Sequence, residues 1–206
     1  MKSIRIFLSI LLGIMILSSA SAQQGVTKAY VGYSVNLPSG SFKDFIKDGS
    51  FRGVELGILH GITDKMAVGF GTGFQDFYQK YPRQVYKAAD GSDISAVVSN
   101  SVQTVPLLAK FRYYFSPGKR IQPFAGAGVG GDMVLYRQFL GEFADSRNKF
   151  AFQAQPEAGI YIPLKPGSES GFSLKASYNY IPFKAGDLKD LNSFGVSASF
   201  NFPLRN

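Results

Sequence analysis

Eight separate stretches of the chain alternate between apolar residues and small or polar ones. In the first stretch, Val31 and Tyr33 alternate with Gly32 and Ser34. Alternation with a period of two residues is typical of a β-strand whose two faces meet different surroundings. The eight stretches cover residues 29–37, 53–58, 66–75, 105–113, 125–130, 150–162, 172–180 and 194–202. The pattern therefore predicts an all-β protein built from eight antiparallel strands.

The two faces of these predicted strands carry different kinds of side chain. One face holds large apolar residues and no charged residue, which is what contact with lipid requires. The other face holds mostly Gly, Ser, Asn and Gln, which suit a narrow interior filled by side chains. A soluble β-sandwich or a lipocalin-like barrel would also alternate, but its large apolar residues would point inward. The sequence therefore favours an eight-stranded antiparallel up-and-down transmembrane β-barrel.

The connections between the predicted strands alternate in length. Short turns are predicted at 61–65, 116–120 and 164–170, and longer loops at 38–50, 76–100, 134–149 and 183–192. Short turns on one side and longer loops on the other are the outer-membrane pattern, with the short side in the periplasm. The even number of strands then places both ends of the barrel domain on the periplasmic side.

Two prolines, Pro106 and Pro156, fall inside predicted strands. A proline cannot donate a backbone hydrogen bond, and a closed barrel has no free edge on which to place it. We therefore expect β-bulges at these positions, or strand segments that rise above the membrane.

The N-terminus has the three regions of a secretory signal peptide. Lys2 and Arg5 supply positive charge, and an apolar run follows at 6–17. A membrane-spanning helix needs about 20 apolar residues, so this run is too short to be an anchor. Ala20 and Ala22 then stand at the two small-residue positions of a cleavage site.

Cleavage at this site would divide the chain into two parts. It predicts a signal peptide at 1–22 and one barrel domain at 23–206, with Gln23 as the first residue of the mature protein. A length of 206 residues suits one domain or at most two. The 23 Gly, 19 Phe and 11 Tyr fit a barrel, because glycine allows close packing in the lumen and aromatic rings mark the membrane interfaces.

Strict alternation places five charged residues on the polar face, and therefore in the lumen. They are Glu55, Lys110, Arg112, Glu157 and Lys175. An unpaired charge in such an interior costs several kcal/mol, so we expect these residues to form an ion-pair network. The strands of Glu157 and Lys175 are neighbours, which favours a direct pair between them. Glu55 is expected to reach across the lumen to Lys110 or Arg112.

Catalytic and metal-binding chemistry has little support in the sequence. The chain has no Cys and a single His, His60, beside the predicted turn at 61–65. A lipid-modifying hydrolase would work near the outer leaflet, so His60 would lie at the wrong end. The glycine-rich segment 126–131 follows a strand but precedes no predicted helix, whereas a dinucleotide site needs that helix. We predict no catalytic residue, metal site or cofactor, and that the protein is not an enzyme.

The net charge of +8 does not by itself indicate a nucleic-acid partner. Most basic residues of the long loops have acidic neighbours, as where Lys43 and Lys47 lie beside Asp44 and Asp48. Proteins that bind nucleic acid concentrate their positive charge on one surface. We therefore predict no nucleic-acid partner.

The stretch VPLLAKFRYYFSPGKRIQPFAGAGVG, at 105–130, resembles a hairpin of the small outer-membrane β-barrel family common in Bacteroidota. The features shared are Pro-Leu-Leu, a basic and aromatic run, a tight turn, and a Gly-Ala-Gly-Val-Gly segment. The stretch ASYNYIPF, at 176–183, is also similar. This family is similar to the barrel domains of OmpA and OmpX in strand number.

The resemblance implies a location in the outer membrane of a Gram-negative cell. Outer-membrane lipid and lipopolysaccharide would surround the barrel, and the barrel-assembly machinery would insert it. Many such barrels end in an aromatic residue that this machinery recognises, whereas here Phe202 is followed by Pro-Leu-Arg-Asn. The resemblance implies no defined biochemical activity and names no ligand for the loops.

Three functions remain open at this point. The first is a structural or interaction role for a barrel with a filled lumen and surface loops. The second is a narrow, porin-like channel or small-molecule carrier, and the third is a lipid-modifying enzyme. Eight strands leave an interior just wide enough for side chains, which favours the first function over the second.

The signal peptide leads to a direct prediction. Because cleavage follows the small residues Ala20 and Ala22, the mature protein should begin at Gln23 and be recovered in the outer-membrane fraction. N-terminal sequencing of the protein from fractionated cells checks this. Retention of Met1, or a soluble periplasmic pool, would contradict it.

Overall fold

The computed structural model describes residues 25–87, 93–140, 143–185 and 188–204. The predicted cleavage residues Ala20, Ala22 and Gln23 lie outside the described residues. Eight strands form the body of the molecule: β1 (Thr27–Pro38), β2 (Ser50–Gly61), β3 (Met66–Lys80), β6 (Val98–Tyr114), β7 (Gln122–Leu140), β8 (Phe143–Pro163), β9 (Gly171–Asn179) and β12 (Ser193–Pro203). No helix in the described part of the chain is long and apolar enough to cross a membrane.

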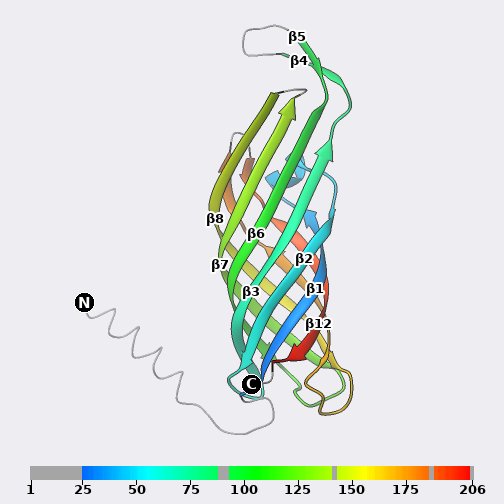
Figure 1. The fold of residues 1–206 in the computed structure, drawn as a ribbon, viewed down its shortest axis with the longest axis vertical. Coiled ribbons are helices and arrows are strands. Elements are labelled where there is room, and N and C mark those ends of the chain that lie inside the picture. Colours follow the sequence, from blue (N-terminus) through cyan, green and yellow to red (C-terminus); the bar gives the residue numbers. More distant parts are fainter. Residues whose placement is uncertain (1–24, 88–92, 141–142, 186–187, 205–206) are drawn as a thin grey trace, which may run out of the picture.

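These eight strands form a closed antiparallel barrel (Figure 1). Each of the eight barrel strands pairs with the next barrel strand along the chain. β12 pairs with β1, from Lys28↔Pro203 to Pro38↔Ser193, and closes the sheet. Closure removes the free edges that an open sheet would leave with unpaired backbone groups. The predicted eight-stranded up-and-down topology is confirmed.

The alternation of the sequence gives the barrel an apolar outside and a polar inside. One exposed outward residue from each strand illustrates this: Val31, Leu56, Phe70, Leu107, Val129, Phe150, Leu174 and Val196. The inward residues are buried and include Gln75, Lys110, Glu157, Lys175 and Ser197. This arrangement is the reverse of a soluble barrel and is the one that lipid contact requires.

One end of the barrel, which we call the turn end, carries the short connections. These connections lie between β2 and β3, between β6 and β7, and between β8 and β9. Gly118 and Gly167 lie in the second and third of these turns with φ of 76° and 78°. A positive φ is a conformation that glycine adopts without steric cost, so these residues allow the chain to reverse within a few positions.

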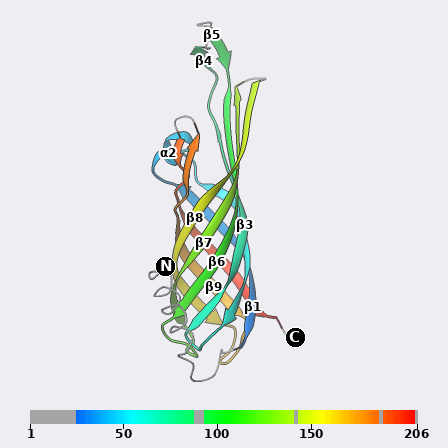
Figure 2. The ribbon, with the colours of Figure 1, turned by 90° about the vertical axis from the view of Figure 1, so that its left-hand side faces the viewer.

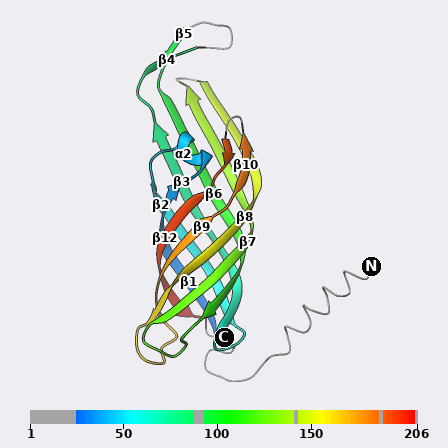
Figure 3. The same ribbon diagram turned by 180° about the vertical axis from the view of Figure 1, so that it is seen from behind.

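The opposite end, the loop end, carries small elements that the alternation did not predict (Figure 3). They are α2 (Ser41–Phe45), the hairpin of β4 (Gln84–Lys87) and β5 (Asp93–Ala96), and the hairpin of β10 (Pro182–Ala185) and β11 (Leu188–Asp190). The β4–β5 hairpin extends away from the barrel, whereas α2 and the β10–β11 hairpin lie near its mouth (Figures 2 and 3).

The prediction of a long loop at 134–149 is wrong. β7 continues to Leu140 and β8 begins at Phe143, and the two strands stay paired up to Leu140↔Phe143. The strands persist because the inward side chains Val134 and Tyr136 remain buried beyond the predicted end of the strand. β6, β7 and β8 therefore rise well above the other strands as a wall at the loop end (Figure 2).

The prolines do not produce the expected bulges. At Pro106, pairing between β6 and β3 is interrupted but resumes in the same register. At Pro156, the ladder between β8 and β9 is interrupted after Glu157↔Ser177, and one further pair in the same register, Ala154↔Tyr180, follows beyond the proline. A register shift occurs instead between β1 and β2, at Ser34 and Asn36. The alternative expectation, strand segments that rise above the membrane, stays a prediction.

An apolar cluster fills the lumen at each end. The loop-end cluster consists of Phe42, Ile46, Phe77, Val102, Val134, Tyr136, Ala151, Ile181, Phe183, Leu188 and Leu191. The turn-end cluster consists of Tyr30, Leu59, Ala67, Tyr114, Phe124 and Tyr161. Asp190 accepts a 2.8 Å hydrogen bond from the Ser41 hydroxyl, which ties α2 to β11 across the mouth. The polar part of the lumen lies between the two clusters.

Candidate functional site

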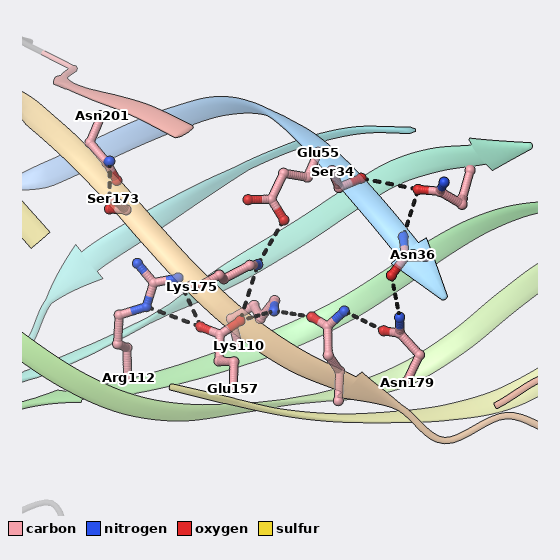
Figure 4. A network of polar contacts seen from close by, with 12 residues as sticks. Ser34, Asn36, Glu55, Lys110, Arg112, Glu157, Ser173, Lys175, Asn179 and Asn201 are labelled. Atoms are coloured by element: carbon pink, nitrogen blue, oxygen red, sulfur yellow. Dashed lines mark hydrogen bonds and ion pairs between the residues drawn. The ribbon is translucent and has the colours of Figure 1, made fainter. Parts of the chain in front are cut away.

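The polar layer of the lumen contains the five charged residues that alternation predicted to face inward. Glu55 lies on β2, Lys110 and Arg112 on β6, Glu157 on β8, and Lys175 on β9. Figure 4 shows their side chains directed toward one another inside the barrel. The structure therefore brings all five into one connected cluster, although four different strands carry them.

Glu157 is the centre of this cluster. Its carboxylate accepts from Lys110 Nζ at 2.7 Å, from Arg112 Nη2 at 2.8 Å and Nε at 3.1 Å, and from Lys175 Nζ at 3.2 Å. The Glu157 side chain is 1% exposed. Removing a carboxylate from water costs several kcal/mol, and this cost is offset only when partners of good geometry surround it. Three cationic partners supply that compensation.

Glycines on β7 allow the ion pairs between β6 and β8, which are not neighbouring strands. Gly126 lies in register between Arg112 and Glu157, and Gly128 lies next to Lys110. A Cβ atom at Gly128 would lie 3.0 Å from Cδ of Lys110. The missing side chains leave a gap over β7 through which the long basic side chains reach Glu157. The lumen-facing glycines of the segment 126–131 therefore make room for these ion pairs.

The partner of Glu55 differs from the expected one. We expected Lys110 or Arg112, but Glu55 Oε2 lies 2.7 Å from Lys175 Nζ. Lys110 and Arg112 are both held by Glu157, whereas Lys175 bridges the two carboxylates. Small lumen residues on β1 and β12, among them Gly32, leave the path from β2 to β9 open. The strand-neighbour argument found the contact between Glu157 and Lys175 but not this cross-lumen pair.

A chain of amide side chains continues the network toward the loop end. Lys110 donates to Gln155, Gln155 donates to Asn179 at 2.6 Å, and Asn179 donates to Asn36 at 3.0 Å. Asn36 then donates to Gln75 at 2.6 Å, so the chain crosses the lumen (Figure 4). Each amide accepts on its oxygen and donates on its nitrogen, which satisfies both polar ends of these buried groups. The alternation placed all five of these residues on the polar face but did not predict the chain.

Asp132 is a sixth charged residue of the lumen that the sequence prediction missed. It lies on β7 and is 1% exposed. It follows Gly130 at the next inward position, but we ended the predicted strand at that glycine. One further step of the same alternation would have placed Asp132 in the lumen. With it, three acidic and three basic residues face the polar layer.

His60 lies near the turn end of β2 with an exposed side chain. Its Nδ1 lies 2.9 Å from Oγ1 of Thr27. Within the residues that the structure describes, no group of three or more His, Cys, Asp or Glu side chains could hold a metal ion. The geometry of the lumen cluster is that of a structural ion-pair network, because its charges are engaged with one another.

A closed antiparallel barrel with an apolar outer face and a polar, ion-paired interior defines a membrane-type β-barrel. The sequence profile of the outer membrane protein beta-barrel domain family matches residues 8–202. The chain therefore belongs to this family and is an outer-membrane barrel protein. A search of curated proteins found no match.

Several solved outer-membrane proteins are similar to this structure at low sequence identity. Ail, the attachment invasion locus protein of Yersinia pestis, has a TM-score of 0.50 and 14% identity, over 87% of this chain and 99% of that chain. Neisserial surface protein A has a TM-score of 0.49 and 16% identity, over 91% and 100%. OprG of Pseudomonas aeruginosa has a TM-score of 0.47 and 15% identity, over 88% and 98%. The likeness to Ail shows the fold alone.

The ion-pair network predicts a large effect of removing its central carboxylate. Glu157→Ala leaves three cations without their shared partner and should lower the free energy of unfolding by about 3 kcal/mol or more. The matched control is Ile160→Val on the outer face of the same strand, which should cost no more than about 1.5 kcal/mol. Urea unfolding in lipid vesicles compares them. Equal losses in the two variants would mean that the cluster is solvated.

The glycine gap over β7 predicts a second effect. Gly128→Val places methyl groups against the stem of Lys110 and should lower the free energy of unfolding by about 1–3 kcal/mol, as overpacking does. Ala127→Val adds similar bulk to the same strand, but on the exposed outer face. It should leave stability nearly unchanged in the same urea assay. The idea fails if Gly128→Val is as stable as Ala127→Val.

Proposed function

We propose that this protein is a non-conducting outer-membrane barrel with a structural or interaction role, exerted through its loop end. The observation that carries this proposal is the filling of the lumen. Apolar clusters occupy both ends, and the ion-pair and amide networks occupy the space between them. Eight-stranded barrels have an interior just wide enough for side chains, and here the side chains use it.

A channel or carrier role has less support from the same observations. The cavity inside the polar layer has a volume of about 60 Å³. That volume holds a few water molecules, not a substrate. A solute would also have to cross both apolar clusters, and the loop-end cluster is tied down by the bond between Ser41 and Asp190.

The wall at the loop end supports an interaction role. β7 has 19 residues and β8 has 21, whereas a membrane-spanning strand needs about 9–11. Among the described residues, the segment of β8 from Phe143 to Gln153 pairs only with β7, although Lys149 Nζ donates to the Lys184 backbone oxygen of β10. A strand segment with one unpaired edge is a surface to which another polypeptide can add a strand. A protein partner at this wall is therefore part of the proposal.

We further propose that the protein is exported to the outer membrane of a Gram-negative cell. The signal peptide at 1–22 directs export, and the barrel-assembly machinery inserts the domain at 23–206. The apolar outer face contacts outer-membrane lipid and lipopolysaccharide, and the turn end faces the periplasm. The protein has no enzymatic activity. The hairpin sequence at 105–130 supports membership of the branch of the family common in Bacteroidota.

The filled lumen predicts that the protein does not conduct ions across a membrane. The purified protein, reconstituted in planar lipid bilayers, should give no sustained conductance of the size that a general porin gives, because both lumen ends are filled. A general porin measured in the same bilayers is the positive control. Sustained porin-sized conductance from this chain would reject the proposal and favour the channel function.

A further inference from the structure

The cavity in the polar layer exposes oxygen atoms that have no hydrogen-bond donor. It extends from the ion-pair network to the loop-end cluster and has a volume of about 60 Å³. Five atoms of its lining residues are buried and have no hydrogen-bond partner among the described residues: both carboxylate oxygens of Asp132, Oε1 of Gln153, Oε1 of Glu55 and Oγ of Ser197. Buried polar atoms in folded proteins almost always form hydrogen bonds. We therefore expect a bound partner that interacts with these oxygen atoms.

The strand register brings Asp132 and Gln153 to the same place. Asp132 lies opposite Ala151 of β8, and Gln153 is the next inward residue on that strand. Diagonal neighbours of this kind lie within reach of long side chains. Both residues are at most 2% exposed. The backbone N–H of Val105 approaches the Asp132 carboxylate, but neither oxygen receives a hydrogen bond of acceptable geometry.

The basic residues that line the same cavity are already engaged. Lys110 binds Gln155 and Glu157, and Lys175 binds Glu55 and Glu157. The Gln153 amide nitrogen donates to Asn179 at 3.2 Å, which leaves its oxygen directed elsewhere. Near Asp132, the cavity therefore presents acceptor atoms. A ligand that binds to these oxygen atoms would be positively charged and would take oxygen atoms as its ligands.

We propose that this cavity binds a monovalent alkali cation, held by the Asp132 carboxylate and the Gln153 amide oxygen, with water completing its coordination. Hard cations take carboxylate, amide and water oxygens as ligands. The five-residue network contains three bases and two acids and carries one net positive charge. A monovalent cation makes the Asp132 site neutral beside it, whereas a divalent cation would place two net positive centres in one lumen.

The test measures whether folding is linked to the cation. The full-length mature protein is unfolded and refolded with urea in lipid vesicles at pH 7.5, in NaCl, KCl, CaCl2 or N-methylglucamine chloride at equal ionic strength. The wild type should have a higher urea midpoint in NaCl or KCl than in N-methylglucamine chloride. A cation at ten times its dissociation constant raises the folding equilibrium constant about tenfold.

Two variants separate the site from general salt effects. Asp132→Asn keeps the shape of the side chain but removes its charge, and it should abolish the difference between the salts. Asp48→Asn removes an exposed acid near the loop end and should retain the difference. As a second measurement, crystals of the wild type grown with Rb⁺ should show anomalous scattering between Asp132 and Gln153, which decides the question even if Asp132→Asn does not fold.

Three results would overturn the proposal. Equal midpoints of the wild type in all salts, together with no Rb⁺ peak, would show that the cavity holds water only. A response to CaCl2 alone would show a divalent site. A midpoint that depends on pH but on no alkali cation would show that a proton on Asp132 is the missing partner.

Discussion

The rest of the lumen depends on the burial of one carboxylate, that of Glu157. A buried charge of this kind is tolerated only where several partners reach it. The need to bring those partners close determines which residues the other strands carry. Lys110 and Arg112 must cross β7, so β7 carries glycine at the crossing positions. Lys175 must hold a second acid, so Glu55 is placed across the lumen. The network is therefore a property of the whole barrel and not of any one hairpin.

The apolar clusters at the two ends give this network its strength. Tyr and Phe side chains close the turn end, and Arg112 lies 4.1 Å from the centre of the Phe124 ring at that boundary. At the loop end, α2 and the β10–β11 hairpin cover the mouth. Exclusion of water lowers the local dielectric constant, which strengthens satisfied pairs and makes unsatisfied groups costly. The closed lumen and the ion pairs of Glu157 therefore depend on each other.

The sequence predicted the barrel well because a period of two residues determines both the strand and the face of each side chain. The inward placement of Glu55, Lys110, Arg112, Glu157 and Lys175 followed from that period. The partner of Glu55 did not, because side-chain reach across a lumen depends on which intervening residues are small. Asp132 was missed because the glycines before it obscured the alternation. The strand segments within 134–149 were missed because their sequence mixes polar and apolar residues, although the packing of Val134 and Tyr136 maintains the strand there.

The separation in sequence between Glu55 and Lys175 has a consequence for how the protein enters its membrane. Their strands meet across the lumen only when β1 joins β12, which is the last seam of the cylinder. Before that seam forms, an open sheet carries charged side chains on a face with no opposite wall. Such a sheet gains little by entering hydrocarbon, because the charges would lose water without gaining partners. We therefore expect insertion and closure to be coupled, with a half-assembled sheet remaining at the aqueous boundary.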